Sequence, residues 1–307
     1  MIIGNFIKEI ELKYKNHYFS DICFDSSKCK KDNIFFAIKG TKIDGNKFIN
    51  YAIQKGAKTI VSNRKIEGIK NNILFIKSSN VRKSLSEFAY KIYKEKPKNI
   101  IAVTGTNGKS SVADFYFQIL KFNKRKVASI GTLGVKTQNY IKKVSNTTMN
   151  PNALGMILNK LKKEKIDDVI LEASSHGLKQ NRLDGLKFNI GIFTNLSHDH
   201  LDYHKTFSDY LKSKLYLFKK LLKKNANIIT DIEIPQYRKI KEIALKNKFN
   251  IETISNNNSN LEIIFHEYLN EKQIVKIKYN KKIYKFETKL IGKIQIKNIL
   301  MAIIAAS

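Results

Sequence analysis

One short segment combines glycines, a lysine and hydroxyl side chains in the order that phosphate binding requires. It consists of Gly105, Thr106, Asn107, Gly108, Lys109, Ser110 and Ser111. Glycines let backbone N–H groups face a phosphate, the lysine reaches terminal phosphate oxygens, and a hydroxyl can ligate Mg²⁺. Val103 stands where the general motif has its first glycine, so the match is to a shorter form. We interpret the segment as an ATP phosphate loop; the alternative is a glycine turn without a ligand.

A carboxylate follows another apolar stretch of the chain. Residues 168–171 are Asp-Val-Ile-Leu, and Glu172 comes directly after them, ahead of two serines and His176. A carboxylate at the end of a buried strand is placed to hold Mg²⁺ opposite a phosphate loop. The alternative is an acid that caps the next helix.

Three of the six histidines lie at positions 198, 200 and 204, after a further apolar stretch. Their spacing fits no structural zinc site, and both cysteines are far away in the sequence. A hard Mg²⁺ ion shared with phosphate is the better interpretation. We predict that His200 is a ligand and that His198 and His204 face solvent.

Size and composition indicate a globular protein of about two domains. No apolar run in the 307 residues approaches the roughly 20 residues of a membrane span, and residues 1–5 lack the features of a signal peptide. These features predict a cytoplasmic protein without membrane insertion. Cys23 and Cys29 form neither a disulfide framework nor a zinc motif, so we expect reduced, structural thiols.

The chain carries 57 Lys and Arg against 26 Asp and Glu, a net charge of +31. Such an excess raises nucleic-acid binding as a hypothesis. The basic residues are scattered, however, and nearly all are lysines, so we expect no nucleic-acid partner. The same field favours an anionic small-molecule substrate.

The elements that must position these residues form two groups. In the first, apolar patterns predict strands at 34–38, 59–61 and 73–76 and helices at 48–56 and 81–93. A polar break, Lys94-Glu95-Lys96-Pro97, ends this group. We predict a small α/β domain over residues 1–97.

In the second group, strands alternate with helices. The predicted strands are 100–103, 126–130, 168–171, 188–194 and 226–230, and the predicted helices are 110–122, 151–164 and 206–223. This alternation indicates a doubly wound, mostly parallel sheet with its ligands at the carboxyl ends of the strands. A hairpin is predicted at 274–286, and an apolar helix within 290–307 resembles a domain junction.

The phosphate loop, the segment 172–178 (Glu-Ala-Ser-Ser-His-Gly-Leu) and the segment 193–204 follow one another along the chain. Together they resemble the motifs of the Mur ligase family, over essentially the whole chain. Within that family they are most similar to the ligases that add the third residue of the peptidoglycan stem peptide. The resemblance implies a uridine-binding domain at 1–97 and a central ATPase domain at 98–307. We expect the family's third, amino-acid-binding domain to be absent from this chain.

The resemblance also implies contacts with the substrate UDP-N-acetylmuramoyl-L-alanyl-D-glutamate. The implied contacts are Phe24, Ser26, Thr41, Lys42 and Ile43 for the uridine part, and Asn146, Thr147, Thr148, Ser174, Gln180 and Arg182 for the muramoyl dipeptide. Asn298 joins the phosphate loop as an implied ATP contact.

Lys214 aligns with a family lysine that CO₂ carbamylates. From composition alone it is one surface lysine among many. Carbamylation replaces a cation that repels Mg²⁺ with a carboxylate-like oxygen ligand. The resemblance thus implies that Ser110 and Glu172 hold one Mg²⁺, and that His200 and carbamylated Lys214 hold a second.

The implied reaction is ATP-dependent amide-bond formation by a monomer. ATP phosphorylates the D-Glu side-chain carboxylate, and the amine of an amino acid, diaminopimelate in preference to lysine, attacks the acyl phosphate. Lys109, Glu172, His200 and Lys214 are the implied catalytic residues. Two alternatives stay open: a fragment that binds UDP-sugar and ATP without ligating them, and a folylpolyglutamate-type ligase.

Overall fold

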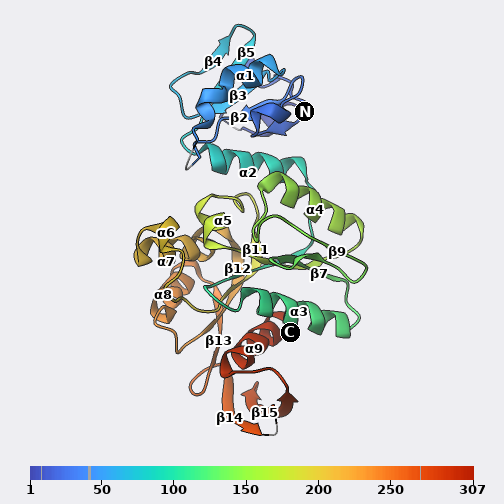
Figure 1. Ribbon diagram of the computed structural model, residues 1–307, viewed down its shortest axis with the longest axis vertical. Helices are drawn as coiled ribbons and strands as arrows, with labels where there is room; N and C mark the ends of the chain where they lie inside the picture. The colour runs from blue at the N-terminus through green and yellow to red at the C-terminus, as the bar shows by residue number, and fades with distance from the viewer. Residues whose placement is uncertain (8, 41–42, 270) are drawn as a thin grey trace. The chain divides into compact units, whose positions relative to one another are not determined.

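A computed structural model describes residues 1–7, 9–40, 43–269 and 271–307 of the chain (Figure 1). Contacts between residues divide it into two compact units. The first contains Met1–Lys94 and Gln180–Gly185, and the second contains Glu95–Lys179 and Leu186–Ser307. In the described part of the chain, no helix is both long and apolar enough to cross a membrane.

The described residues of the first unit form a five-stranded sheet in the order β1-β2-β3-β5-β4. Only β4 runs antiparallel to its neighbour. The strands are β1 (Ile22–Cys23), β2 (Ile34–Phe36), β3 (Thr59–Ser62), β4 (Gly68–Lys70) and β5 (Ile73–Lys77). The helices are α1 (Ile49–Gln54) and α2 (Val81–Ile92), with short 3₁₀ turns η1 (Ile3–Asn5), η2 (Leu12–Tyr14), η3 (Ser26–Lys28) and η4 (Gly45–Phe48).

Alternate residues of β2 serve two separate cores of the first unit. Ile34 and Phe36 pack with Phe88 of α2 on one face, and Phe35 packs with Ile49 of α1 on the other. Successive side chains of a strand point to opposite faces, so a short run of apolar residues anchors a helix on each side.

The segment Gln180–Gly185 is separated from the rest of the first unit by residues 95–179 but packs on α2. Ser86 donates a hydrogen bond to the carbonyl of Asn181 at 2.5 Å, and the Tyr90 hydroxyl donates to the carbonyl of Arg182 at 2.7 Å. These are contacts between residues more than 90 positions apart. No local pattern in the sequence indicates them.

The described residues of the second unit form an eleven-stranded sheet in the order β16-β15-β14-β13-β12-β11-β6-β10-β7-β8-β9. Pairing is parallel from β14 through β7 and antiparallel at both edges. The strands are β6 (Asn99–Thr104), β7 (Val127–Gly131), β8 (Gly134–Lys136), β9 (Ile141–Lys142), β10 (Asp168–Glu172), β11 (Phe188–Phe193), β12 (Leu222–Asp231), β13 (Asn250–Ser255), β14 (Leu261–Leu269), β15 (Lys272–Tyr279) and β16 (Lys282–Thr288). The predicted α/β class with a mostly parallel central sheet is confirmed.

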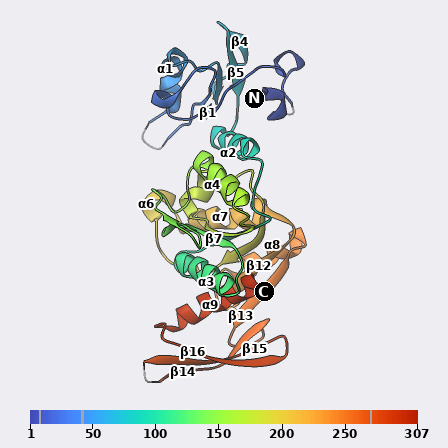
Figure 2. The ribbon, with the colours of Figure 1, turned by 90° about the vertical axis from the view of Figure 1, so that its right-hand side faces the viewer.

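Helices cover this sheet, and two of them share one core. They are α3 (Lys109–Phe122), α4 (Pro151–Lys163), α5 (Ser175–Lys179), α6 (Leu201–His204), α7 (Phe207–Tyr216), α8 (Tyr237–Asn247) and α9 (Lys293–Ala306). Figures 1 and 2 show α9 lying beside α3 on one face of the sheet. Residues of both helices, among them Tyr116 and Leu300, pack with Ile101 and Val103 of β6.

One predicted helix is shorter than the sequence suggests. The pattern predicts a helix over 206–223, but α7 ends at Tyr216, a π-helical turn η5 (Leu217–Leu221) follows, and Leu222 begins β12. Leu222 pairs with Phe188 in the parallel ladder, so the pairing of β12 with β11 ends the helix. The strands β8, β9, β13 and β14 and the helix α8 were not predicted, whereas the hairpin β15–β16 was.

Candidate functional site

The phosphate loop connects β6 to α3 at the carboxyl edge of the central sheet. Two of its glycines have backbone angles that other residues adopt with strain: φ is +154° at Gly105 and +85° at Gly108. A Cβ at Gly105 would overlap the hydroxyl of Thr194. Asn107 donates its backbone N–H to the Asn195 side chain at 3.0 Å, which ties the loop to the segment after β11. The loop is therefore held in one shape by the residues that follow β11.

Lys109 is the first residue of α3, and its side chain folds back over the loop. Its Nζ donates hydrogen bonds to the carbonyls of Gly105 at 3.0 Å and Thr106 at 2.8 Å. Burial lowers the pKa of Lys109, while the nearby carboxylates of Glu172 and Asp199 act in the opposite direction. The ammonium thus lies beside the backbone groups of a helix N-terminus, where a phosphate would be bound.

Glu172 lies at the end of β10, next to the phosphate loop. Ser110 donates its hydroxyl to Glu172 Oε2 at 3.0 Å, and Thr132 donates its backbone N–H to Oε1 at 2.9 Å. The residue is 2% exposed. A Cβ at Gly131 would overlap the carboxylate, so this glycine is needed for the close approach.

The pairing of Ser110 with Glu172 fits a Mg²⁺ site completed by a phosphate. Both contribute oxygen atoms, and Mg²⁺ in phosphate-binding sites takes one or two carboxylates and fills its other positions with phosphate oxygens and water. In the part of the chain that the structure describes, no three His, Cys, Asp or Glu side chains converge as a metal site.

Lys214 is buried in the same region, on α7. It is 1% exposed, and its Nζ donates a hydrogen bond to the carbonyl of Gly105 at 2.6 Å. Burial, with a smaller contribution from the charge of Lys109, lowers the pKa of Lys214 to about 6. The amine is therefore largely neutral at pH 7, unlike that of a surface lysine.

The three histidines of the segment 198–204 have different environments. His198 and His200 are exposed, and His200 lies at φ +53° with its ring 5.0 Å from that of His176. His204 is fully buried, and burial lowers its pKa to about 4. The prediction that His198 faces solvent is confirmed, and the same prediction for His204 is wrong. The rings of His176, Tyr203 and Tyr210 pack around His204. The spacing of residues near His204 in the sequence does not predict these contacts.

Tyr210 and Asp199 join the site, although sequence reasoning did not select them. The hydroxyls of Tyr210 and Thr106 are hydrogen-bonded at 3.0 Å, and the Tyr210 ring contacts Lys214 Nζ, 4.5 Å from its centroid. Asp199 Oδ2 lies 3.5 Å from His200 Nε2. The negative charge of Asp199 also acts to raise the pKa of Lys109 and of Lys214, against the effect of burial. The position of Tyr210 one helical turn before Lys214 was the only local signal.

Asn298 approaches the phosphate loop from α9. It is 3% exposed, and a Cβ at Gly108 would lie 2.5 Å from its Oδ1. Its Nδ2 donates to the Gln295 side chain at 3.2 Å. A residue near the C-terminal end of the chain thus covers the turn that begins α3.

Part of the predicted dipeptide-binding set lies near Glu172 in the second unit. Thr148 donates its hydroxyl to the carbonyl of Glu172 at 2.9 Å and accepts from the backbone N–H of Ser174 at 2.9 Å. The hydroxyls of Thr147 and Thr132 are 3.1 Å apart, and Asn146 is exposed. These hydroxyl-rich residues line up along the carboxyl ends of β7 and β10.

The remaining predicted substrate residues belong to the first unit. Phe24 is 40% exposed, Ile43 is 61% exposed, and Ser26 is half-buried at the start of η3, after the Asp25 cap. Gln180 accepts hydrogen bonds from the Arg182 guanidinium at 3.1 and 2.8 Å. Thr41 and Lys42 lie outside the described residues. The predicted substrate contacts are therefore divided between the two units.

Two models of protein families match this chain. Residues 103–306 match the model described as Mur ligase middle domain, and residues 19–97 match the model described as Mur ligase family, catalytic domain. A protein of Rickettsia montanensis named UDP-N-acetylmuramoyl-L-alanyl-D-glutamate--2,6-diaminopimelate ligase is 36% identical over 95% of this chain. The chain spans 61% of that relative's length.

Solved structures resemble the chain as well. A structure titled UDP-N-acetylmuramoyl-L-alanyl-D-glutamate--2,6-diaminopimelate ligase has a TM-score of 0.87 and 26% identity, covering 100% of this chain and 63% of its own. A MurF ligase from Thermotoga maritima in complex with ADP has a TM-score of 0.61 at 20% identity, covering 92% of this chain and 62% of its own. The second of these shows likeness of fold alone.

Proposed function

The chain belongs to the Mur ligase family, and on this premise we propose that it takes part in ATP-dependent amide-bond formation in peptidoglycan synthesis. The proposed substrate is UDP-N-acetylmuramoyl-L-alanyl-D-glutamate, and the proposed added residue is diaminopimelate. The observation that carries the proposal is the convergence of Lys109, Glu172 and Lys214 on one phosphate loop. ATP and a nucleotide-activated sugar are cytoplasmic metabolites, so we place the reaction in the cytoplasm.

In this proposal ATP occupies the loop from Gly105 to Ser111, with Asn298 beside it. Backbone N–H groups at the start of α3 and the Lys109 ammonium bind the phosphates. The D-Glu carboxylate attacks the γ-phosphorus, the bond to ADP breaks, and an acyl phosphate forms. The amine of the amino acid then attacks the acyl carbon and releases orthophosphate, with loss of a proton from the amine. Lys109 neutralises charge on the transferred phosphoryl group.

Ser110 and Glu172 would hold one Mg²⁺, and His200 with Lys214 would hold a second. The ions supply electrostatic stabilisation of the phosphoryl oxygens when bound. Carbamylation would give Lys214 an oxygen ligand: burial favours its neutral amine, which attacks the carbon of CO₂ to form an N–C bond and loses a proton. We propose that Lys214 is carbamylated in the working enzyme.

Binding and turnover on the purified chain test the proposal. Titration calorimetry with the UDP-dipeptide and with MgADP should give saturable binding of both. Orthophosphate release with ATP, UDP-dipeptide and diaminopimelate then tests ligation. A chain that binds neither ligand contradicts the proposal, and a chain that binds a folate in place of the UDP-dipeptide supports the folylpolyglutamate-type alternative. Binding of both ligands without release supports the non-ligating fragment.

A further inference from the structure

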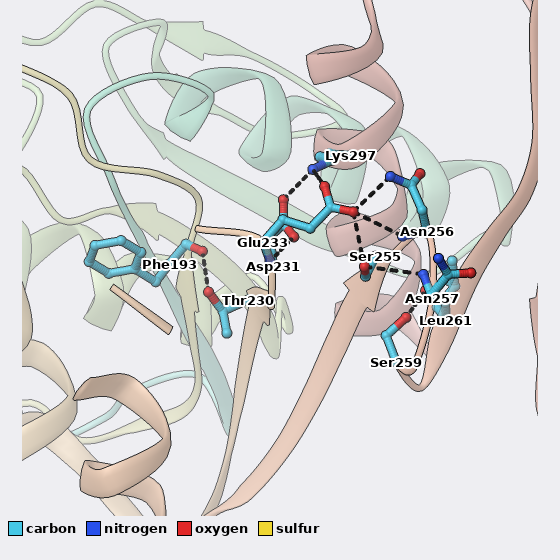
Figure 3. Close-up of polar contacts among 10 residues, drawn as sticks. All are labelled: Phe193, Thr230, Asp231, Glu233, Ser255, Asn256, Asn257, Ser259, Leu261 and Lys297. Carbon is cyan, nitrogen blue, oxygen red and sulfur yellow. Dashed lines mark hydrogen bonds and ion pairs between the residues drawn. The ribbon is translucent and has the colours of Figure 1, made fainter. Parts of the chain in front are cut away.

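An ion-pair network joins α9 to the carboxyl end of β12, through side chains that the proposed reaction does not use. Lys297 Nζ lies 2.5 Å from Asp231 Oδ2 and 2.7 Å from Glu233 Oε2. Figure 3 shows the lysine reaching from α9 to both carboxylates, one on the last residue of β12 and one just after it. The Asp231 side chain is 4% exposed and that of Lys297 is 19% exposed. At such burial, removal of one partner leaves an uncompensated charge.

The carboxylates also connect β12 with β13. Glu233 Oε1 accepts hydrogen bonds from the Ser255 hydroxyl at 3.1 Å and from the Asn256 side-chain amide at 2.7 Å (Figure 3). Asp231 Oδ1 accepts the backbone N–H of Glu233 at 2.8 Å. The hydrogen bond from Lys297 lowers the pKa of Glu233 to about 2. Three segments of the chain therefore meet at one lysine.

The next residue along α9 is Asn298, which contacts the phosphate loop. Adjacent residues of a helix point about 100° apart, so Lys297 is directed to the strand ends while Asn298 is directed to Gly108. The apolar side of α9 packs through Ile296, Leu300 and Met301. Apolar packing is less directional than a hydrogen-bonded ion pair, so it restricts the rotation of a helix less sharply. An ion pair with two hydrogen bonds does specify direction.

We infer that Lys297 is a positioning residue for the nucleotide site: its ion pairs with Asp231 and Glu233 set the rotation of α9 and so hold Asn298 over Gly108. The inference rests on the proposed function for the identity of the ligand. It assigns no contact between Lys297 and the nucleotide. Its effect passes entirely through Asn298.

A double-mutant cycle on MgADP affinity tests this route. Lys297→Met keeps an unbranched side chain and removes the ammonium, and we expect it to weaken MgADP binding about tenfold in titration calorimetry. In an Asn298→Ala background the same substitution should change the dissociation constant by less than about twofold. Lys297→Arg, which keeps the charge, should restore binding. Lys293→Met, an equal loss of charge at an exposed position of α9, is the matched control.

Hydrogen exchange separates this inference from the proposed function. In the free protein, Lys297→Met should speed exchange in a peptide covering residues 105–111, and Lys293→Met should leave it unchanged. Equal exchange rates in wild type and Lys297→Met would overturn the inference even if nucleotide binds. Equal weakening of MgADP binding in both backgrounds of the cycle would overturn it too. Failure of the wild-type chain to bind MgADP contradicts the proposed function, and the exchange rates still decide the role of Lys297.

A second variant guards against misfolding of Lys297→Met. Glu233→Gln preserves shape and the Asp231–Lys297 pair but removes one of the two charges on the lysine's partners. We expect a smaller increase in exchange at 105–111, in the same direction. An unchanged rate in this variant, with Lys297→Met unfolded, would also count against the inference.

Discussion

The phosphate-loop region and the predicted uridine region are built in opposite ways. Around the loop, charged side chains are buried and joined by hydrogen bonds, as with Glu172 at 2% and Lys214 at 1% exposure. In the first unit, Phe24 and Ile43 are 40% and 61% exposed and lie outside the helices and strands. Burying a charged group costs free energy unless hydrogen bonds or opposite charges hold it in place, so the charged groups around the loop are fixed in position before a ligand binds. Exposed segments contribute contact area to a bound ligand. Substitutions near the loop should therefore affect the rate of the reaction, and those in the exposed segments should affect substrate affinity only.

The strongest test of this contrast is Lys109→Ala. We expect orthophosphate release to fall by at least about 100-fold, because Lys109 supplies the positive charge that neutralises the transferred phosphoryl group. Among the described residues, no other charged ammonium contacts the loop carbonyls that Lys109 contacts. Lys214 Nζ also reaches one of these carbonyls, but its pKa of about 6 leaves it largely neutral at pH 7. Lys121→Ala, at an exposed position of the same helix, is the control. Near-normal release by the Lys109 variant would remove the phosphate-loop assignment.

Glu172→Gln should have the next largest effect. It keeps the hydrogen bond from Ser110 but lowers the charge available to Mg²⁺, so the Mg²⁺ concentration for half-maximal phosphate release should rise by about tenfold or more. Glu242→Gln, on an exposed helix face, should leave the Mg²⁺ dependence unchanged. Chelation of Mg²⁺ should stop release in every variant. An unchanged Mg²⁺ requirement in Glu172→Gln contradicts the site.

Lys214→Met should stabilise the fold while it removes activity. The folded pKa of Lys214 is about 6 against an ordinary 10.5, so between these values the unfolded chain binds a proton that the folded chain does not. The burial of Lys214 therefore lowers the free energy of unfolding most below pH 6, and this destabilisation disappears as the pH rises to 10.5.

Denaturant unfolding in CO₂-free buffer measures this difference. At pH 7 we expect the methionine variant to be more stable by about 1–3 kcal/mol, with the difference shrinking at higher pH. A variant that is less stable at pH 7, or a difference independent of pH, would contradict the buried neutral amine.

The smallest effect should come from the exposed turn. Ser26→Ala should weaken UDP-dipeptide binding by about threefold, through loss of one hydrogen bond at a half-buried position, and leave the melting temperature unchanged. Titration calorimetry and thermal unfolding measure both quantities. A large loss of stability would mean that η3 is as tightly built as the phosphate loop, and the contrast between the regions would fail.

Local patterns in the sequence predicted much of the sheet and the loop. The strands β2, β6, β10 and β11 and the helix α3 follow from apolar runs, glycines and caps, which are properties of residues close together in the chain. The end of α7 could not be predicted, because it depends on the pairing of Leu222 with Phe188, more than 30 positions earlier. Likewise, β14 could not be predicted from its own residues. It pairs in parallel with β13 and antiparallel with β15, so its place in the sheet depends on these two neighbouring strands.

The sequence by itself determined the glycine-containing turn between β6 and α3, the carboxylate at the end of β10 and the α/β class, because each is specified by residue types at short spacing. Only the tertiary structure decided which of many lysines is buried, that His204 is enclosed, and that Asn298 covers Gly108. It also decided that Gln180–Gly185 packs with the first unit. The physical reason is that burial and close approach depend on contacts between distant segments, which exist only once the sheet has assembled.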